Sequence, residues 1–254
     1  MRPPIAEIVL DRPADGNTFT PELLSELAAA AVRLATEANV RAVVVRGSGK
    51  NFCFGANIDM FLEEPADRRP ALLRDLVTRF HVAITRLARL ELPVLGVAHG
   101  MVVGGGLALL GACDVVLAAE STRFRMGWSG IGITMDGGAT WTLPRIIGAR
   151  RTLELISTNR IFTAAEAERW GLVNWLAPEA DLEKRTAEIA RTLAAGPTRA
   201  LGLCKRLVIG GGSQSFETHL EDEAVALVEA VGTADADEGL RAFRERRPPR
   251  FSGR

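Results

Sequence analysis

Short apolar runs alternate with segments of helical pattern along the first part of the chain. The strand candidates are dense in Val, Ile, Leu and Ala, and they lie at 5–10, 42–46, 94–98 and 114–118. The helical segments between and after them lie at 21–36, 70–90 and 105–112, and Thr20 with Pro21 supplies an N-cap candidate and a first-turn proline for the first of these. This order of strands and helices favours an α/β fold.

The pattern changes toward the end of the chain. From residue 182 onward strand signals nearly vanish, and helical segments follow at 182–194, 197–209, 214–231 and 237–243. We therefore expect a core of residues 1–195 and a helical region of residues 196–254. A glycine-rich stretch at 127–138 precedes a further helix at 149–157, and irregular stretches of this length often carry function.

Two glycine loops, Gly55-Ala56-Asn57-Ile58 and Gly104-Gly105-Gly106-Leu107, each follow an apolar run and open into helical pattern. The first turn of a helix has free N–H groups and a positive dipole end, so two converging starts would stabilise the oxygen of a thioester that becomes an enolate. Tight turns alone would also use glycine. Three successive glycines cost roughly 1 kcal/mol each against alanine inside a helix, which favours close approach of a ligand.

Composition narrows the class of protein. The 254 residues carry 31 basic and 31 acidic side chains, so net charge predicts no nucleic-acid partner. No stretch approaches the roughly 20 uninterrupted apolar residues of a membrane span, and we expect a cytoplasmic protein without a membrane partner. The 3 cysteines are widely spaced, which fits neither a disulfide framework nor a zinc site, and the scattered histidines predict no metal.

Several motifs together resemble the crotonase (enoyl-CoA hydratase/isomerase) superfamily. They are Asn17-Thr18-Phe19-Thr20-Pro21-Glu22-Leu23, Phe52-Cys53-Phe54-Gly55-Ala56-Asn57-Ile58, Gly100 through Asp114, and Glu238-Gly239-Leu240-Arg241-Ala242-Phe243. The resemblance implies a crotonase-like spiral of ββα repeats with a C-terminal α-helical trimerisation region, and self-association as a trimer or a dimer of trimers. It also implies an acyl-CoA substrate, with coenzyme A as part of that substrate and no separate cofactor.

The same resemblance assigns roles to the two glycine loops. The N–H groups of Ala56 and Gly105 would form the oxyanion hole. The remaining substrate-binding positions would be Gly55, Asn57, Ile58, Asp59, Gly104 and Trp128. For the coenzyme A phosphates the cationic candidates are Arg12, Lys50, Arg246 and Arg247, the last two from a neighbouring subunit.

The two glutamates with which hydratases of this family activate water are absent. Ala108 and Trp128 stand at their positions, and neither alanine nor indole can accept a proton, so addition of water by a glutamate pair is disfavoured. Asp136 is the carboxylate that remains in the later loop, where it would also suit a turn before Gly137. The first hypothesis is enoyl-CoA isomerisation, in which Asp136 takes a proton from the substrate and returns it at another carbon.

A second hypothesis comes from spacing. His81, Gly105, Trp128 and Asp136 lie 24, 23 and 8 residues apart, as the same residue types do in 4-chlorobenzoyl-CoA dehalogenases. That resemblance would make Asp136 a nucleophile toward an aromatic carbon, Trp128 its hydrogen-bond donor and His81 the base that hydrolyses the aryl ester. His81 and Trp128 could equally serve packing. A third hypothesis, a protein that binds acyl-CoA without transforming it, also stays open, and the sequence does not reveal the acyl group.

Overall fold

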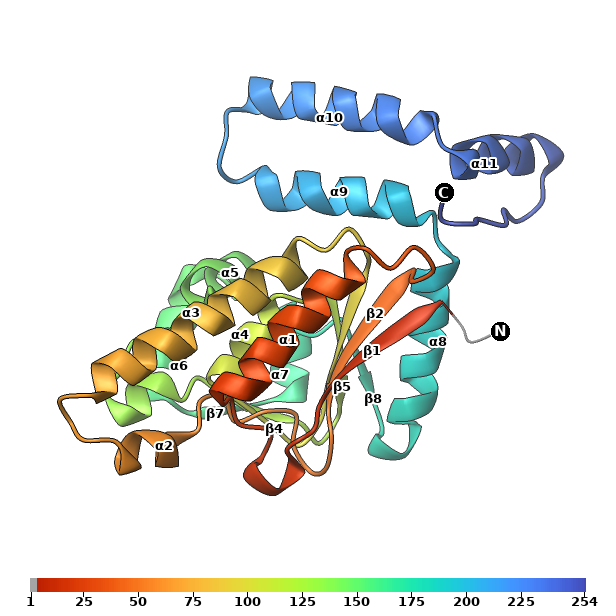
Figure 1. The fold of residues 1–254 in the computed structure, drawn as a ribbon. Coiled ribbons are helices and arrows are strands. Elements are labelled where there is room, and N and C mark those ends of the chain that lie inside the picture. The colour runs from red at the N-terminus through yellow and green to blue at the C-terminus, as the bar shows by residue number, and fades with distance from the viewer. Residues whose placement is uncertain (1–3) are drawn as a thin grey trace.

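A five-stranded parallel sheet forms the centre of the protein, whose computed structural model describes residues 4–254 (Figure 1). Its strands follow one another in the order β1 (Ile5–Leu10), β2 (Ala42–Gly47), β3 (Val94–Ala98), β5 (Val115–Ala119) and β8 (Trp175–Ala177). A smaller sheet contains β4 (Met101–Val103), β6 (Arg123–Arg125) and β7 (Ile161–Thr163). In it β4 pairs parallel with β6, and β6 pairs antiparallel with β7.

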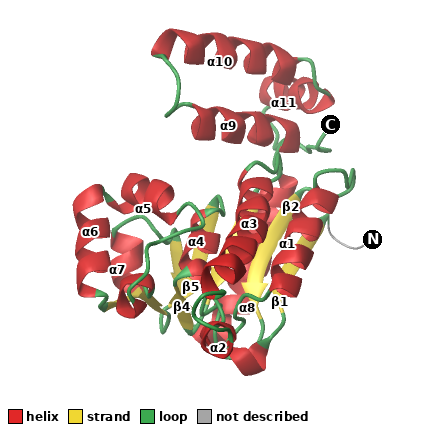
Figure 2. Cartoon of the chain, turned by 60° about the vertical axis from the view of Figure 1, so that its left-hand side comes forward, coloured by secondary structure: helices red, strands yellow, loops and turns green. Residues whose placement is uncertain are grey.

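Helices cover both sheets. On one side lie α1 (Pro21–Leu34) and α3 (Arg69–Ala88), and Figure 2 shows α5 to α7 gathered at the opposite side of the molecule. The other helices of the core are α2 (Ile58–Glu63), α4 (Gly105–Gly111), α5 (Ala139–Ile147), α6 (Ala149–Thr158), α7 (Ala164–Arg169) and α8 (Leu182–Ala195). The last three helices are α9 (Thr198–Gly210), α10 (Phe216–Val231) and α11 (Ala234–Glu245).

The chain repeats one unit as it winds. A strand of the five-stranded sheet is followed by a strand of the smaller sheet and then by a helix. This order is seen in β3, β4 and α4, and again in β5, β6 and α5. In the earlier repeats, isolated bridges stand in place of the second strand: Phe19 bridges Ala56, and Cys53 bridges Val102. The expected α/β spiral of ββα units is therefore confirmed. The first glycine loop follows Cys53, which bridges Val102 of the smaller sheet.

Local sequence explains the elements that were predicted well. Thr20 caps α1 by accepting a hydrogen bond from Leu23 N, and Pro21 begins the helix. Strand β2 is almost entirely buried because it lies between β1 and β3 with helices on both faces, which is why its sequence is continuously apolar. Helix α5 was missed: Pro144 lies inside it, and proline inside a helix normally argues against one.

The helices from α9 onward form a separate layer at the top of Figure 1. Residues after α11 fold back to the start of that helix, where the buried carboxylate of Asp235 accepts hydrogen bonds from Ser252 N at 2.6 Å and Gly253 N at 2.8 Å. Arg41 donates to Phe251 O at 2.9 Å and so ties this terminal segment to the core. Within residues 4–254, no helix has the length and apolar character needed to cross a membrane.

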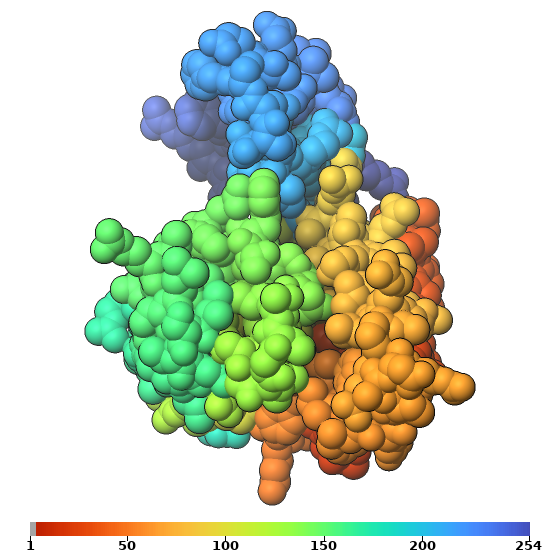
Figure 3. Space-filling model, turned by 90° about the vertical axis from the view of Figure 1, so that its left-hand side faces the viewer, coloured from red at the N-terminus to blue at the C-terminus, as the bar shows by residue number. Residues whose placement is uncertain are grey.

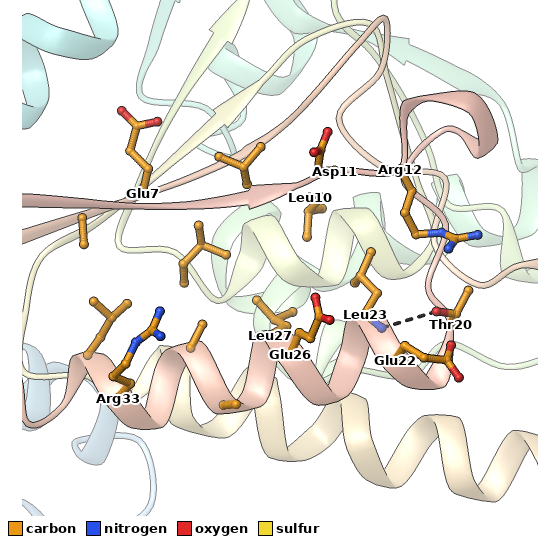
Figure 4. Close-up of a pocket in the computed structure, with 16 residues that line it drawn as sticks. Glu7, Leu10, Asp11, Arg12, Thr20, Glu22, Leu23, Glu26, Leu27 and Arg33 are labelled. Carbon is orange, nitrogen blue, oxygen red and sulfur yellow. Dashed lines mark hydrogen bonds between the residues drawn. The ribbon is translucent and has the colours of Figure 1, made fainter.

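A hollow of about 690 Å³ lies between β1 and α1 (Figure 4). Its floor is apolar, with Leu10, Leu23 and Leu27 pointing into the space between strand and helix, while charged side chains such as Glu7 and Arg33 stand at its margins. The described residues that line it include none of the predicted catalytic positions.

Candidate active site

A cavity of about 440 Å³ lies where the two glycine loops meet the segment around Trp128. The space-filling view shows the hollow between the orange α2–α3 region and the green segment that follows β6 (Figure 3). Its walls are mainly apolar, and they consist of Phe19, Leu24, Phe54, Ala56, Ile58, Leu73, Leu76, Val77, Phe80, Val103, Gly104, Gly105, Arg125, Gly127, Trp128, Ile131, Ile133, Thr134 and Asp136.

The two predicted oxyanion donors both line this cavity. Among the hydrogen bonds of the described residues, none uses the N–H of Ala56 or of Gly105. The two loops touch: a Cβ added at Gly55 would lie 2.7 Å from Gly105 N, and Gly55 also has a φ of +79°, which favours glycine. Two unpaired N–H groups on adjoining loops in an apolar cavity are suited to bind a thioester oxygen.

Asp136 lines the same cavity and is paired with Trp128. The indole Nε1 donates to Asp136 Oδ1 at 3.0 Å. Burial raises the pKa of the Asp136 carboxyl above its usual range, while the Trp128 hydrogen bond and the nearby His81 pull that pKa back down. The side chain does not cap α5, whose N-cap is Gly138 without a side-chain partner. The carboxylate is therefore partly desolvated, oriented by one donor and turned toward the cavity.

His81 lies beside this pair but outside the lining of the cavity. It is exposed on α3, and its Nε2 accepts a hydrogen bond from Gly137 N at 3.3 Å. In this contact Nε2 is the hydrogen-bond acceptor. For His81 to take a proton, a water must replace this long contact with Gly137.

The other predicted substrate-binding residues divide into two groups. Ile58 and Gly104 line the cavity together with the donors, whereas Gly55, Asn57 and Asp59 do not. Asn57 instead caps α2, because its Oδ1 accepts from Asp59 N at 3.0 Å and from Met60 N at 3.4 Å. The side chain of Asn57 thus positions the start of the helix that follows the first glycine loop.

One charged residue and one aromatic contact at the site were not found from sequence. Arg125 is the cation among the lining residues, and its Nε donates to Asn159 O at 3.0 Å. Phe19 packs against Phe80 with ring centroids 4.7 Å apart, and both rings belong to the cavity wall. The aromatic residues lie on segments far apart in the chain, so no local pattern could have joined them.

The candidate phosphate ligands lie away from this cavity, and none of the four lines it. Arg12 is paired with Asp15 at 2.5 Å, and Arg247 is paired with Glu238 at 2.6 Å and Glu245 at 2.7 Å. Their assignment stays a prediction. In the described part of the chain, no group of three or more His, Cys, Asp or Glu side chains is placed to hold a metal ion.

Comparison with known proteins identifies the family. The model of the enoyl-CoA hydratase/isomerase family matches residues 2–254. The chain belongs to this family. A solved enoyl-CoA hydratase from Bacillus anthracis superposes with a TM-score of 0.91 at 33% identity, covering 98% of this chain and 95% of that one. The family establishes an acyl-CoA enzyme, in agreement with the resemblance carried by the motifs.

Relatives within the family have names that imply different reactions. The chain is 37% identical to 4-chlorobenzoyl coenzyme A dehalogenase-2 of Arthrobacter sp, over 95% of this chain and 88% of that protein. It is 30% identical to 1,2-epoxyphenylacetyl-CoA isomerase of Escherichia coli strain K12, over 98% and 95%. Other relatives carry the name "Probable enoyl-CoA hydratase". The family thus gives the class of enzyme, and the reaction must be argued from the site.

Proposed function

We propose that this enzyme hydrolyses the carbon–halogen bond of a 4-halobenzoyl-CoA thioester. The observation that carries the proposal is the hydrogen bond from Trp128 Nε1 to Asp136 Oδ1, made inside a cavity that also contains two unpaired backbone donors. The Trp128 hydrogen bond lowers the pKa of Asp136 and so makes the carboxylate a weaker general base. A nucleophile gains orientation, because the bonded oxygen leaves the other one aimed at the substrate.

In the first step a carboxylate oxygen of Asp136 attacks the ring carbon that bears the halogen. The new C–O bond pushes one electron pair through the ring into the thioester carbonyl, whose oxygen is stabilised by the N–H groups of Ala56 and Gly105. When that pair returns, the C–X bond breaks and halide leaves with its bonding electrons. The product is an aryl ester of Asp136. The carbonyl accepts the electron pair when the halogen is para or ortho to it, and a meta halogen lacks this conjugation.

In the second step water attacks the carboxyl carbon of this ester. His81 accepts a hydrogen bond from the N–H of Gly137, the residue after Asp136, and it is the base that takes the proton of this water. The aryl oxygen leaves, and the sum of both steps converts the aryl halide and water into a hydroxyaryl thioester, a proton and halide. Asp136 is regenerated with one oxygen atom derived from water.

Isomerisation of an enoyl-CoA is the second candidate function. It was the first hypothesis from the sequence, and the raised pKa of Asp136 supports it because such a carboxyl group can take and return a proton. The aromatic walls and the Trp128 donor favour the aryl reaction over it. Hydration by a glutamate pair is disfavoured, since Ala108 is buried and apolar at one of the two positions.

The experiment is oxygen labelling in 4-chlorobenzoyl-CoA turnover. Halide release is measured by ion chromatography, and the product is analysed by mass spectrometry after reaction in water enriched in heavy oxygen. With enzyme in excess, the first turnover must give a product oxygen derived from Asp136, hence unlabelled. With substrate in excess, later turnovers must give labelled product. Labelled product in the first turnover would contradict the covalent step.

A parallel arm separates the other hypotheses. The protein is incubated in heavy water with 3-enoyl, 2-enoyl and benzoyl thioesters, and deuterium uptake is followed by mass spectrometry. Exchange into an enoyl thioester without halide release would replace the dehalogenase proposal by isomerisation. Tight binding of the thioesters with neither exchange nor halide release would indicate a binding protein.

We also propose that the protein self-associates through α9 to α11, as a trimer or a dimer of trimers. Large apolar side chains of this layer, including Phe216, Val228 and Phe243, are exposed in the single chain. Exposed apolar patches of this kind mark interaction surfaces. Light scattering tests the proposal, because a monomeric mass at micromolar concentration would contradict it.

A further inference from the structure

The buried amide of Asn17 holds together the segments that lead to the first oxyanion donor. Its side chain has no exposed surface, and its backbone adopts a φ of +56°. Nδ2 donates to Ser48 O at 2.9 Å, Asn51 O at 2.8 Å and Phe52 O at 3.1 Å, while Oδ1 accepts from Arg12 N at 2.8 Å. The side chain of Asn17 thus pairs with three carbonyl groups in the segment 48–52, which leads directly to Cys53.

Cys53 continues this network into the glycine loop. Its thiol donates to Asn17 O at 3.1 Å and accepts from Gly55 N at 3.2 Å. Burial raises the pKa of the Cys53 thiol to about 12, so the sulfur keeps the proton with which it donates. The thiol is therefore a two-way bridge between the Asn17 segment and the loop.

The bridge decides which N–H faces the cavity. Gly55 has both backbone groups occupied, since its N–H reaches Cys53 Sγ and its carbonyl accepts from Phe19 N at 2.7 Å. The next N–H, that of Ala56, has no acceptor within the described chain, and Ala56 lines the cavity. The second glycine loop packs closely against Cys53, because a Cβ added at Gly106 would lie 2.5 Å from Cys53 O.

We infer that Asn17 and Cys53 are positioning residues for the oxyanion hole, acting through Gly55 to aim the Ala56 N–H at the thioester oxygen. The inference rests on the proposed function only for the presence of a thioester in this cavity, and it holds for any reaction that charges the carbonyl oxygen. Neither Asn17 nor Cys53 lines the cavity.

The test uses the carbonyl stretching frequency of bound benzoyl-CoA, labelled isotopically at the carbonyl carbon, by difference infrared spectroscopy. Benzoyl-CoA carries no halogen, so the readout does not depend on turnover. Cys53→Ala should lose part of the lowering in frequency seen with the unaltered protein, and kcat should fall about tenfold with KM little changed, a fraction of the loss caused by removing an oxyanion donor outright. Cys53→Ser keeps a donor and an acceptor and should restore both.

Cys113→Ala is the matched control, because Cys113 packs against the same core but its thiol contacts Leu109 O and no part of the glycine loops. It should leave the frequency and kcat unchanged. Asn17→Ala should act like Cys53→Ala if it folds, as judged by circular dichroism. A folded Cys53→Ala protein with the full frequency shift would overturn the inference, as would absence of any shift in the unaltered protein. Absent halide release with an intact shift would refute the dehalogenase proposal alone.

Discussion

Helices α1 and α10 have similar apolar content, but in the single chain the apolar face of α1 is buried and that of α10 is exposed. Helix α1 buries Leu23, Leu24, Leu27, Ala31 and Leu34 against the sheet and α3. Helix α10, with 16 residues, buries Ala226 alone, and Val228 remains 71% exposed. The apolar face of α1 has a partner in the same chain, whereas that of α10 requires a partner from outside.

The comparison separates catalysis from assembly. Each described residue that lines the candidate active-site cavity comes from the part of the chain before Ala139, and none from α9 to α11. Changes at Asp136 or Trp128 should therefore affect turnover without affecting association. Changes on the exposed faces of α10 and α11 should affect association first.

The largest effect is expected for Asp136→Asn. The amide is a poor nucleophile and a poor base, so kcat should fall by at least about 10³-fold, while binding of benzoyl-CoA stays within a few fold. Halide release measures the fall in kcat, and equilibrium binding of benzoyl-CoA measures the affinity. The mass in light scattering should equal that of the unaltered protein, and a change in mass would contradict the separation of catalysis from assembly.

The next effect concerns the exposed helices. The double substitution Val228→Glu with Phe243→Glu places two charges where we expect an apolar interface, and self-association should weaken by roughly 100-fold or more. Analytical ultracentrifugation over a range of concentrations measures this. Val32→Glu on α1, also an exposed apolar position, is the matched control and should leave the mass unchanged. An unchanged mass in the double variant would refute α10 and α11 as the interface.

Sequence predicted the parts of this protein that depend on local pattern. Continuous apolar runs identified β1, β2, β3 and β5, and the cap at Thr20 identified the start of α1. The smaller sheet was missed because its strands of three residues leave almost no periodicity. At the site, motif order predicted Ala56, Gly105 and Asp136, all of which line one cavity. Arg125 and the Asn17–Cys53 bridge depend on contacts between distant segments, which no local pattern contains.

A smaller effect is expected for Trp128→Phe. Loss of one hydrogen bond to a charged group amounts to about 1.5–3 kcal/mol, so kcat should fall at least about tenfold. The Trp128 bond lowers the pKa of Asp136, and its removal should raise that pKa further. Because the reaction requires the carboxylate, the acid limb of the pH profile of kcat/KM should move to higher pH. A limb that moves to lower pH, or does not move, would contradict the assigned role of the indole.

The smallest effect concerns the joint between the two regions. Lys205 of α9 donates to Asp114 Oδ2 at 2.9 Å, and Lys205 is only 10% exposed. Lys205→Met should lower the free energy of unfolding by about 2 kcal/mol near neutral pH, between the values for exposed and buried pairs. Lys184→Met on exposed α8 surface is the control. Burial already raises the pKa of Asp114, and loss of Lys205 raises it further.

The sign of the pH dependence follows from that shift. A carboxyl group whose pKa is higher in the folded state favours folding below its unfolded pKa and loses that contribution as pH rises through the folded pKa. The stability deficit of Lys205→Met should therefore shrink as pH falls from about 7 toward about 5. Denaturant unfolding at several pH values measures it. A deficit that is independent of pH would mean that Lys205 joins α9 to the core through packing and its bond to Leu92 O rather than through the charge of Asp114.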